Sequence, residues 1–287
     1  MKGFDEMEGV DVFRLEGFEK GELIDWYVAN GYVLVDEVLS AAECDEIVAD
    51  LKKINRGDYG CEPIAAVDWS AGADRLLGRY MYIGEPHAYS SVIRRYITHP
   101  GMCRVLDCVV GAYVPFWDGG YKCMQTMFVT KGPGGNGSPW HQDEQPIPTR
   151  DRSLTGVWIA LADTTKDNGC LWILPESHKS GVIYERYPHD LPDVDSMPIA
   201  RGFDDAGAVP VEMRKGSVLF FSGYLLHSSK KNDTATYRPA LTLHYASAAT
   251  WLSWKGEPNY RGVIQVKGED PYAGLGYAAP TPWAKEC

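Results

Sequence analysis

His141, Gln142 and Asp143, in the middle of the chain, place an imidazole and a carboxylate two positions apart. In an extended segment residues i and i+2 point to the same side, so these two groups can converge on one point. Two histidines and one carboxylate form the ligand set of many non-haem iron(II) enzymes, which leaves coordination positions open. A His-x-Asp motif also arises by chance, so it needs support from other residues.

A third candidate ligand, His227, lies a short distance before Arg238. If Asn232-Asp233 forms the tip of a hairpin, His227 lies opposite Arg238, and Ser229 opposite Thr236, with all four side chains on one face. A planar guanidinium binds a carboxylate through two hydrogen bonds. The pattern therefore suits a dicarboxylate that chelates a metal at one end and contacts arginine at the other.

The secondary structure that must position these residues is predicted to be mainly helical in the first part of the chain and mainly β in the second. Helices are predicted at 20–30, 40–54, 88–98 and 101–110, with a strand at 32–36. Gly31 ends the first helix, Ser40 and Glu43 form a capping box for the second, and Pro100 separates the last two.

From Tyr121 onward short β-rich runs alternate with turn signals. The runs are 124–130, 156–161, 170–174, 217–221 and 238–245. Asp167-Asn168-Gly169 predicts a hairpin between the second and third of them. Many short strands at this spacing indicate a sandwich, barrel or jelly roll. The segment 181–210 has no period and is rich in Pro, Asp and Gly, so we expect it to be a lid or binding loop.

The composition limits which classes of protein this chain can belong to. The chain has 287 residues, of which 45% are hydrophobic and 12% aromatic, enough for one large core. A net charge of −11 argues against general binding to nucleic acid or anionic membranes. The sequence lacks a signal-peptide pattern and an apolar run of membrane-spanning length. These features predict a cytoplasmic protein whose partner is a small molecule.

Several further segments form one ordered pattern with the candidate ligands. They are Gln125-Thr126-Met127, Lys131, 140–143, Trp158, 167–179, 215–221, 225–227, Arg238 and 244–248. In these residues the stretch from Met124 to Ala248 resembles the phytanoyl-CoA dioxygenase family, a branch of the 2-oxoglutarate oxygenases. The helix–strand–helix at 20–54 is similar to the N-terminal decoration of that family.

The resemblance implies a fold that is mainly β with α decorations. We expect a single domain over 1–287, with N-terminal helices at about 1–115, a double-stranded β-helix (a cupin-like jelly roll) at about 116–250, and a C-terminal extension at 251–287. The resemblance also implies ligand roles for seven residues. Iron(II) would be bound by His141, Asp143 and His227, and 2-oxoglutarate would be contacted by Arg238, Ser229, Trp158 and Gln125.

The implied activity is an iron(II)- and 2-oxoglutarate-dependent dioxygenase. It would use O2 to hydroxylate an unactivated C–H bond of a small molecule, anionic or acyl-type, with release of succinate and CO2. Two alternatives stay open: a metal-binding jelly-roll module without catalysis, and a cupin-type enzyme that does not use 2-oxoglutarate. Arg238 argues against the second, because that enzyme would not need to hold a dicarboxylate.

Other polar residues have less specific interpretations. His244 shares a strand face with Arg238 but lies about 20 Å further along the strand, so we expect a core histidine outside the metal site. An anionic substrate group has five candidate partners that are equally interpretable as surface charges: Arg75, Arg79, Arg150, Arg152 and Arg201.

Overall fold

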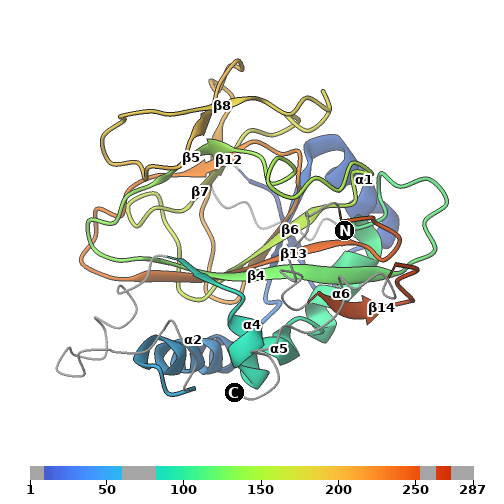
Figure 1. The fold of residues 1–287 in the computed structure, drawn as a ribbon, viewed down its shortest axis with the longest axis horizontal. Helices are drawn as coiled ribbons and strands as arrows, with labels where there is room; N and C mark the ends of the chain where they lie inside the picture. Colours follow the sequence, from blue (N-terminus) through green and yellow to red (C-terminus); the bar gives the residue numbers. More distant parts are fainter. Residues whose placement is uncertain (1–9, 60–81, 253–262, 273–287) are drawn as a thin grey trace.

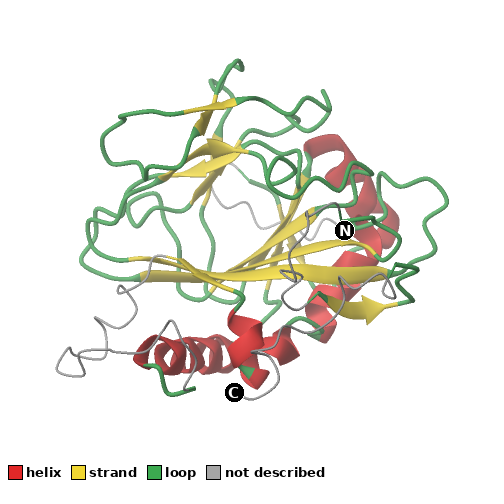
Figure 2. Ribbon diagram, in the orientation of Figure 1, coloured by secondary structure: helices red, strands yellow, loops and turns green. Residues whose placement is uncertain are grey.

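The computed structural model describes residues 10–59, 82–252 and 263–272. In these ranges two β-sheets face each other, with the smaller sheet above the larger in Figure 1. Helices cover the outer face of the larger sheet (Figure 2). This is the mainly β jelly roll with helical decorations that the sequence predicted. Arg75 and Arg79 lie outside the described residues.

The larger sheet has eight strands among the described residues. Its order is β1 (Val12–Arg14), β2 (Tyr32–Asp36), β11 (Val218–Ser222), β6 (Thr155–Ala160), β13 (Arg238–Ser247), β4 (Tyr121–Lys131) and β14 (Ile264–Lys267), and β3 (Tyr82–Gly84) also pairs with β4. All these pairs are antiparallel except β1 with β2.

The smaller sheet has four short strands in the described ranges. Their order is β10 (Val209–Val211), β7 (Leu171–Ile173), β12 (His227–Ser229) and β5 (Ser138–His141). The segment 181–210 adds a two-stranded ribbon, β8 (Arg186–Tyr187) with β9 (Ile199–Ala200). In Figure 1 this ribbon lies at the top, beside the smaller sheet.

The helices begin and end where local chemistry requires. They are α1 (Lys20–Asn30), α2 (Ala41–Arg56), α4 (Pro86–Tyr89), α5 (Ser91–Tyr96) and α6 (Pro100–Val109). The Ser40–Glu43 capping box is present at the start of α2. The predicted helix 88–98 is two short helices, because Ser90 is extended and its hydroxyl caps α5. Within the described ranges no helix has the length and apolar character needed to cross a membrane.

Glycine at position 31 is required for two reasons. The residue has a φ of 84°, a left-handed conformation that ends α1 and that side chains rarely adopt. A side chain there would also collide with the ring of His178, which packs against this turn. The predicted end of the first helix is therefore confirmed.

Strand β13 connects the hydrophobic core to the space between the sheets. Its residues are all buried, but successive side chains point to opposite faces of the sheet. Leu241, Leu243 and Tyr245 join the apolar cluster that also contains residues of the helices. Arg238 and His244 lie on the opposite face and line the space between the two sheets. One strand thus supplies both core packing and polar groups.

Both predicted hairpins are wrong. His227 pairs with His141 and Ile173 in the smaller sheet, whereas Arg238 pairs with Lys131 in the larger sheet. Thr236 is exposed in the connection between the sheets. The turn at Asp167-Asn168-Gly169 likewise joins β6 of the larger sheet to β7 of the smaller one. A local turn signal shows where the chain reverses, but it does not identify the strand's hydrogen-bonding partner.

Candidate functional site

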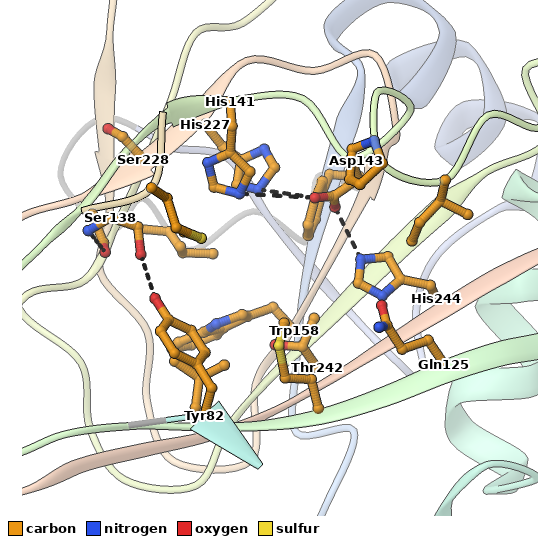
Figure 3. Close-up of a pocket in the computed structure, with 18 of the residues that line it drawn as sticks. Tyr82, Gln125, Ser138, His141, Asp143, Trp158, His227, Ser228, Thr242 and His244 are labelled. Carbon is orange, nitrogen blue, oxygen red and sulfur yellow. Dashed lines mark hydrogen bonds and ion pairs between the residues drawn. The ribbon is translucent and has the colours of Figure 1, made fainter. Parts of the chain in front are cut away.

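A cavity of about 610 Å³ lies between the two sheets (Figure 3). Strands of both sheets and the segment 181–210 contribute to its wall. The seven predicted site residues all line it: Gln125, His141, Asp143, Trp158, His227, Ser229 and Arg238. Chain segments far apart in sequence therefore meet in one space, although the hairpin that was expected to join them does not form.

His141, Asp143 and His227 form a compact cluster at one end of the cavity. Their candidate ligand atoms all lie within 4.8 Å of one another. Oδ1 of Asp143 is 3.8 Å from Nε2 of His141 and 3.7 Å from Nε2 of His227. The two histidines face each other across β5 and β12, and their ring centroids are 4.1 Å apart. Three candidate metal-ligand atoms thus lie around a common centre.

Asp143 reaches this centre from a turn. Strand β5 ends at His141, so the expectation of an extended His141-Gln142-Asp143 segment is wrong. The turn is fixed by hydrogen bonds from the backbone N–H of Ile147 to the Asp143 carbonyl and from the N–H of Glu144 to Gly223. The turn brings the carboxylate next to both imidazoles.

Backbone carbonyls orient both imidazoles. Nδ1 of His141 is 2.8 Å from the Pro139 carbonyl, and Nδ1 of His227 is 3.0 Å from the Leu225 carbonyl. A carbonyl oxygen only accepts, so each Nδ1 carries a proton and Nε2 is the ring nitrogen left to bind a metal at the centre. Burial and the neighbouring His227 lower the pKa of His141 to about 4, which keeps its ring neutral.

Asp143 is held ionised by its neighbours. Burial alone would raise its pKa, but the adjacent His227 and His244 lower it below the ordinary value. Nε2 of His244 is 3.0 Å from Oδ2 of Asp143, and both residues are labelled in Figure 3. His244 is buried and is not among the three candidate ligands, as predicted. The prediction missed its contact with Asp143, because it considered only the surroundings of Arg238, whereas the cavity extends along β13 from Arg238 to His244.

Arg238 is a buried cation at the other end of the cavity. Its side chain is among the largest fully buried ones, and its Cζ lies 5.1 Å from the centroid of the Trp158 ring. Its Nε and Nη1 atoms have no hydrogen-bond partner within the described part of the chain. Burial lowers the pKa of the guanidinium to about 10, so it stays protonated at neutral pH. Two donors are therefore available to an anion.

Lys131 is a second cation at this end, to which the sequence assigned no role. Its ammonium donates to Oγ of Ser229 at 2.8 Å and to the carbonyl of Lys230. Ser229 Oγ also accepts from the backbone N–H of Ser138 at 3.1 Å. Burial, and then the nearby charge of Arg238, lower the pKa of Lys131 to about 7. The signal was present in the sequence, because Lys131 ends a strand whose alternate residues face inward.

The segment 181–210 is attached to the candidate metal centre through Gln142. The buried side-chain amide of Gln142 donates to the carbonyls of Val182 and Tyr224, at 2.9 and 2.7 Å, and accepts from the N–H of Tyr184 at 2.9 Å. Gln142, which lies between two candidate ligands in the sequence, thus holds the start of the segment 181–210 by hydrogen bonds.

A second attachment joins this segment to the opposite side of the cavity. The hydroxyl of Tyr82 lies 3.0 Å from Oδ2 of Asp195 and 2.9 Å from Oγ of Ser138. Figure 3 shows the contact between Tyr82 and Ser138. The segment therefore borders the cavity and is bonded to both of its walls.

Arg186 and Met197 of the same segment line the cavity. The side chain of Arg186 has no hydrogen bond or ion pair within the part of the chain that the structure describes, although its backbone pairs with Ala200. Its charge contributes to the lowered pKa of His141, which indicates that it lies near the candidate metal centre. The sequence did not single out this residue. Three of the predicted arginines, Arg150, Arg152 and Arg201, do not line the cavity.

The cavity fits both a metal ion and a dicarboxylate. Two imidazoles that present Nε2 and one ionised carboxylate are the donor set that iron(II) accepts with open positions left over. The unpaired Nε and Nη1 atoms of Arg238 need an anionic partner, and a carboxylate matches their planar geometry. A molecule with a chelating end and a distal carboxylate would satisfy both ends of the cavity.

Comparison with known proteins gives a family match over residues 27–240, to the family described as phytanoyl-CoA dioxygenase. A phytanoyl-CoA dioxygenase of Arabidopsis thaliana is 38% identical over 122 residues, 42% of this chain and 43% of the relative. The human peroxisomal phytanoyl-CoA dioxygenase is 25% identical over 242 residues, 78% of this chain and 67% of the relative. The chain spans about half the length of the plant relatives it matches.

Solved structures share the fold at lower identity. The non-heme monooxygenase ThoJ superposes with a TM-score of 0.67 at 22% identity, covering 90% of this chain and 86% of ThoJ. The α-ketoglutarate-dependent epimerase SnoN superposes with a TM-score of 0.62 at 21% identity, covering 88% of this chain and 92% of SnoN. At these identities the similarity supports the jelly-roll fold and leaves the reaction open.

Proposed function

The chain belongs to the phytanoyl-CoA dioxygenase family, and we propose that it is an iron(II)- and 2-oxoglutarate-dependent oxygenase that hydroxylates a C–H bond of a small anionic molecule. The main support for the proposal is that a candidate metal site and a candidate carboxylate site lie in the same cavity. A cluster of two histidines and one aspartate lies at one end, and the buried, unpaired Arg238 lies at the other.

Each end of the cavity has a defined role in this proposal. His141, Asp143 and His227 hold the metal. Arg238 binds the distal carboxylate of 2-oxoglutarate, while Trp158 supports the guanidinium through its ring face. When bound, iron(II) and 2-oxoglutarate activate O2 for attack on a C–H bond and yield succinate and CO2.

Ser229 and Lys131 complete the carboxylate end. Ser229 lines the cavity and accepts a hydrogen bond from the Lys131 ammonium, so a second positive charge lies next to the cavity wall although Lys131 does not itself line it. Gln125 lines the cavity opposite His244 on the paired strand, nearer the metal than the carboxylate end. We assign Gln125 to the wall of the substrate space rather than to the distal carboxylate.

The remaining wall suits a largely apolar substrate that carries one anionic group. Met127, Val129, Ile147 and Met197 line the cavity and favour an aliphatic or acyl skeleton. Arg186 adds a cation without a partner among the described residues, close to the metal end. A carboxylate or similar anion bound there would hold a neighbouring C–H bond beside the metal. The segment 181–210, which carries Arg186, would act as the lid.

The proposed function is tested by substrate-dependent turnover of the purified chain. The protein loaded with iron(II) should convert 2-oxoglutarate to succinate in the presence of O2, and a panel of aliphatic acids should raise this rate and yield a hydroxylated product. Mass spectrometry measures both products, and an Asp143→Ala variant serves as the inactive control. Absence of succinate in every reaction, together with no measurable binding of iron(II) or 2-oxoglutarate, would favour a non-catalytic jelly-roll module.

The titration of Lys131 predicts a pH dependence of cosubstrate binding. The pKa of this buried ammonium is lowered to about 7, and a bound carboxylate raises it again by attraction. Affinity for 2-oxoglutarate should therefore be greatest below pH 7 and fall as the pH rises through the free and then the bound pKa. Lys131→Met should weaken binding at low pH and flatten this fall. Calorimetry on the Mn(II)-loaded protein between pH 6 and 9 tests this, and equal slopes for both proteins would exclude Lys131 from the site.

Arg186 predicts selectivity for anionic substrates. Hydrogen bonds to charged groups contribute about 1.5–3 kcal/mol, so Arg186→Gln should lower kcat/KM for an accepted acid roughly 10- to 100-fold. The same variant should change kcat/KM little for the corresponding neutral amide. Arg201→Gln is the matched control, because Arg201 is exposed on the same segment and does not line the cavity. A parallel loss for acid and amide would show that Arg186 does not bind the anion.

A further inference from the structure

The three candidate metal ligands differ in how they are held. The imidazoles of His141 and His227 are each oriented by a backbone carbonyl two residues earlier, at Pro139 and Leu225. Asp143 is oriented by a side chain from the opposite sheet, His244 of β13. The carboxylate is thus the ligand whose orientation depends on the relative position of the two sheets.

His244 contacts a single oxygen of the carboxylate. Its Nε2 lies 3.0 Å from Oδ2 of Asp143, while Oδ1 faces Nε2 of both candidate histidine ligands at 3.7–3.8 Å. Since an ionised carboxylate only accepts hydrogen bonds, His244 donates from Nε2. A lone pair of Oδ2 is then directed away from the metal, and Oδ1 is presented to it.

The backbone around His244 is adapted to this contact. The pairing of β13 with β4 shifts register between His244 and Tyr245: His244 pairs with Gln125 and Tyr245 pairs with Cys123, so Met124 is the extra residue. Such bulges redirect side chains and are frequent beside active sites. His244 is 3% exposed, and its Nδ1 has no hydrogen-bond partner in the described ranges. The one hydrogen bond of its ring is therefore directed at Asp143.

This arrangement affects the number of open metal positions. An octahedral ion held by two imidazoles and one carboxylate oxygen retains about three positions. A chelating keto acid takes two of them, and O2 needs the last. A carboxylate bound through both oxygens would occupy the position that O2 requires. A contact that keeps the carboxylate bound through one oxygen would therefore keep the position for O2 open.

We propose that His244 is a positioning residue that restricts Asp143 to coordination through Oδ1 and so keeps one metal position open. The inference rests on the proposed function, because it requires that the cluster binds a metal. It adds a role for a residue that touches neither the metal nor the cosubstrate carboxylate. His244 acts through Asp143, as outer partners of metal ligands commonly do.

Mn(II) binding to the purified full chain tests the inference without turnover. His244→Phe keeps an aromatic ring but removes the donor, so Mn(II) should bind roughly 10- to 100-fold more weakly. The bound Mn(II) should also relax water protons less, because the second carboxylate oxygen displaces a water. His244→Gln restores an N–H donor at the same number of bonds from Cβ as Nε2. It should recover both the affinity and the proton relaxation.

Tyr245→Phe is the matched control. Tyr245 is the next residue of β13, points to the outer face, and donates from its hydroxyl to the Ile97 carbonyl at 2.9 Å. The substitution also removes a buried hydrogen bond, so it should lower the free energy of unfolding by about 1–3 kcal/mol but leave Mn(II) binding and proton relaxation unchanged.

The outcomes separate this inference from the proposed function. Wild-type affinity and relaxation in His244→Phe would overturn the role of His244 while leaving the metal site intact. Equal losses in His244→Phe and Tyr245→Phe, or no recovery in His244→Gln, would reduce the effect to general destabilisation and also overturn it. A wild-type chain that binds no Mn(II) would contradict the proposed function itself.

Discussion

Burial of the Arg238 guanidinium between two sheets removes a charge from water, at a cost of several kcal/mol. The ring of Trp158 covers one face of it, yet Nε and Nη1 lack partners in the described ranges. A buried guanidinium with unpaired N–H groups can bind an anion directly. The charge attraction and hydrogen bonds of the bound anion then offset the free energy lost when the guanidinium was removed from water. Lys131 and Ser229 beside it reinforce the same preference.

Strand β13 connects the buried Arg238 to the metal end of the cavity. Its inward residues run from Arg238 to His244, so the anion site and the support of Asp143 lie on one rigid element. Its outward residues, such as Leu243, are packed in the main apolar core. The separation of the two ends is therefore set by the strand and not by a flexible loop.

Sequence patterns predicted most helices and strands, because capping, glycine and alternation signals are local. The capping box at Ser40 and the end of α1 at Gly31 are examples. The candidate site residues were assigned from the family resemblance, and the structure places all seven in the wall of one cavity. Long-range pairing was not predictable from local signals: the hairpin between His227 and Arg238 does not exist, since the chain crosses between sheets there. The contact between His244 and Asp143 was missed for the same reason. Distance along a strand did not reveal that the opposite sheet brings Asp143 to it.

The binding of 2-oxoglutarate to the Mn(II)-loaded protein and to an Arg238→Lys variant tests the central claim most directly. Lysine keeps the charge but loses the planar pair of donors, so 2-oxoglutarate should bind roughly 10- to 100-fold more weakly while the Mn(II) affinity stays at the wild-type value. Calorimetry measures both constants. An unchanged affinity for 2-oxoglutarate in Arg238→Lys would contradict the claim that this buried guanidinium defines the cosubstrate site.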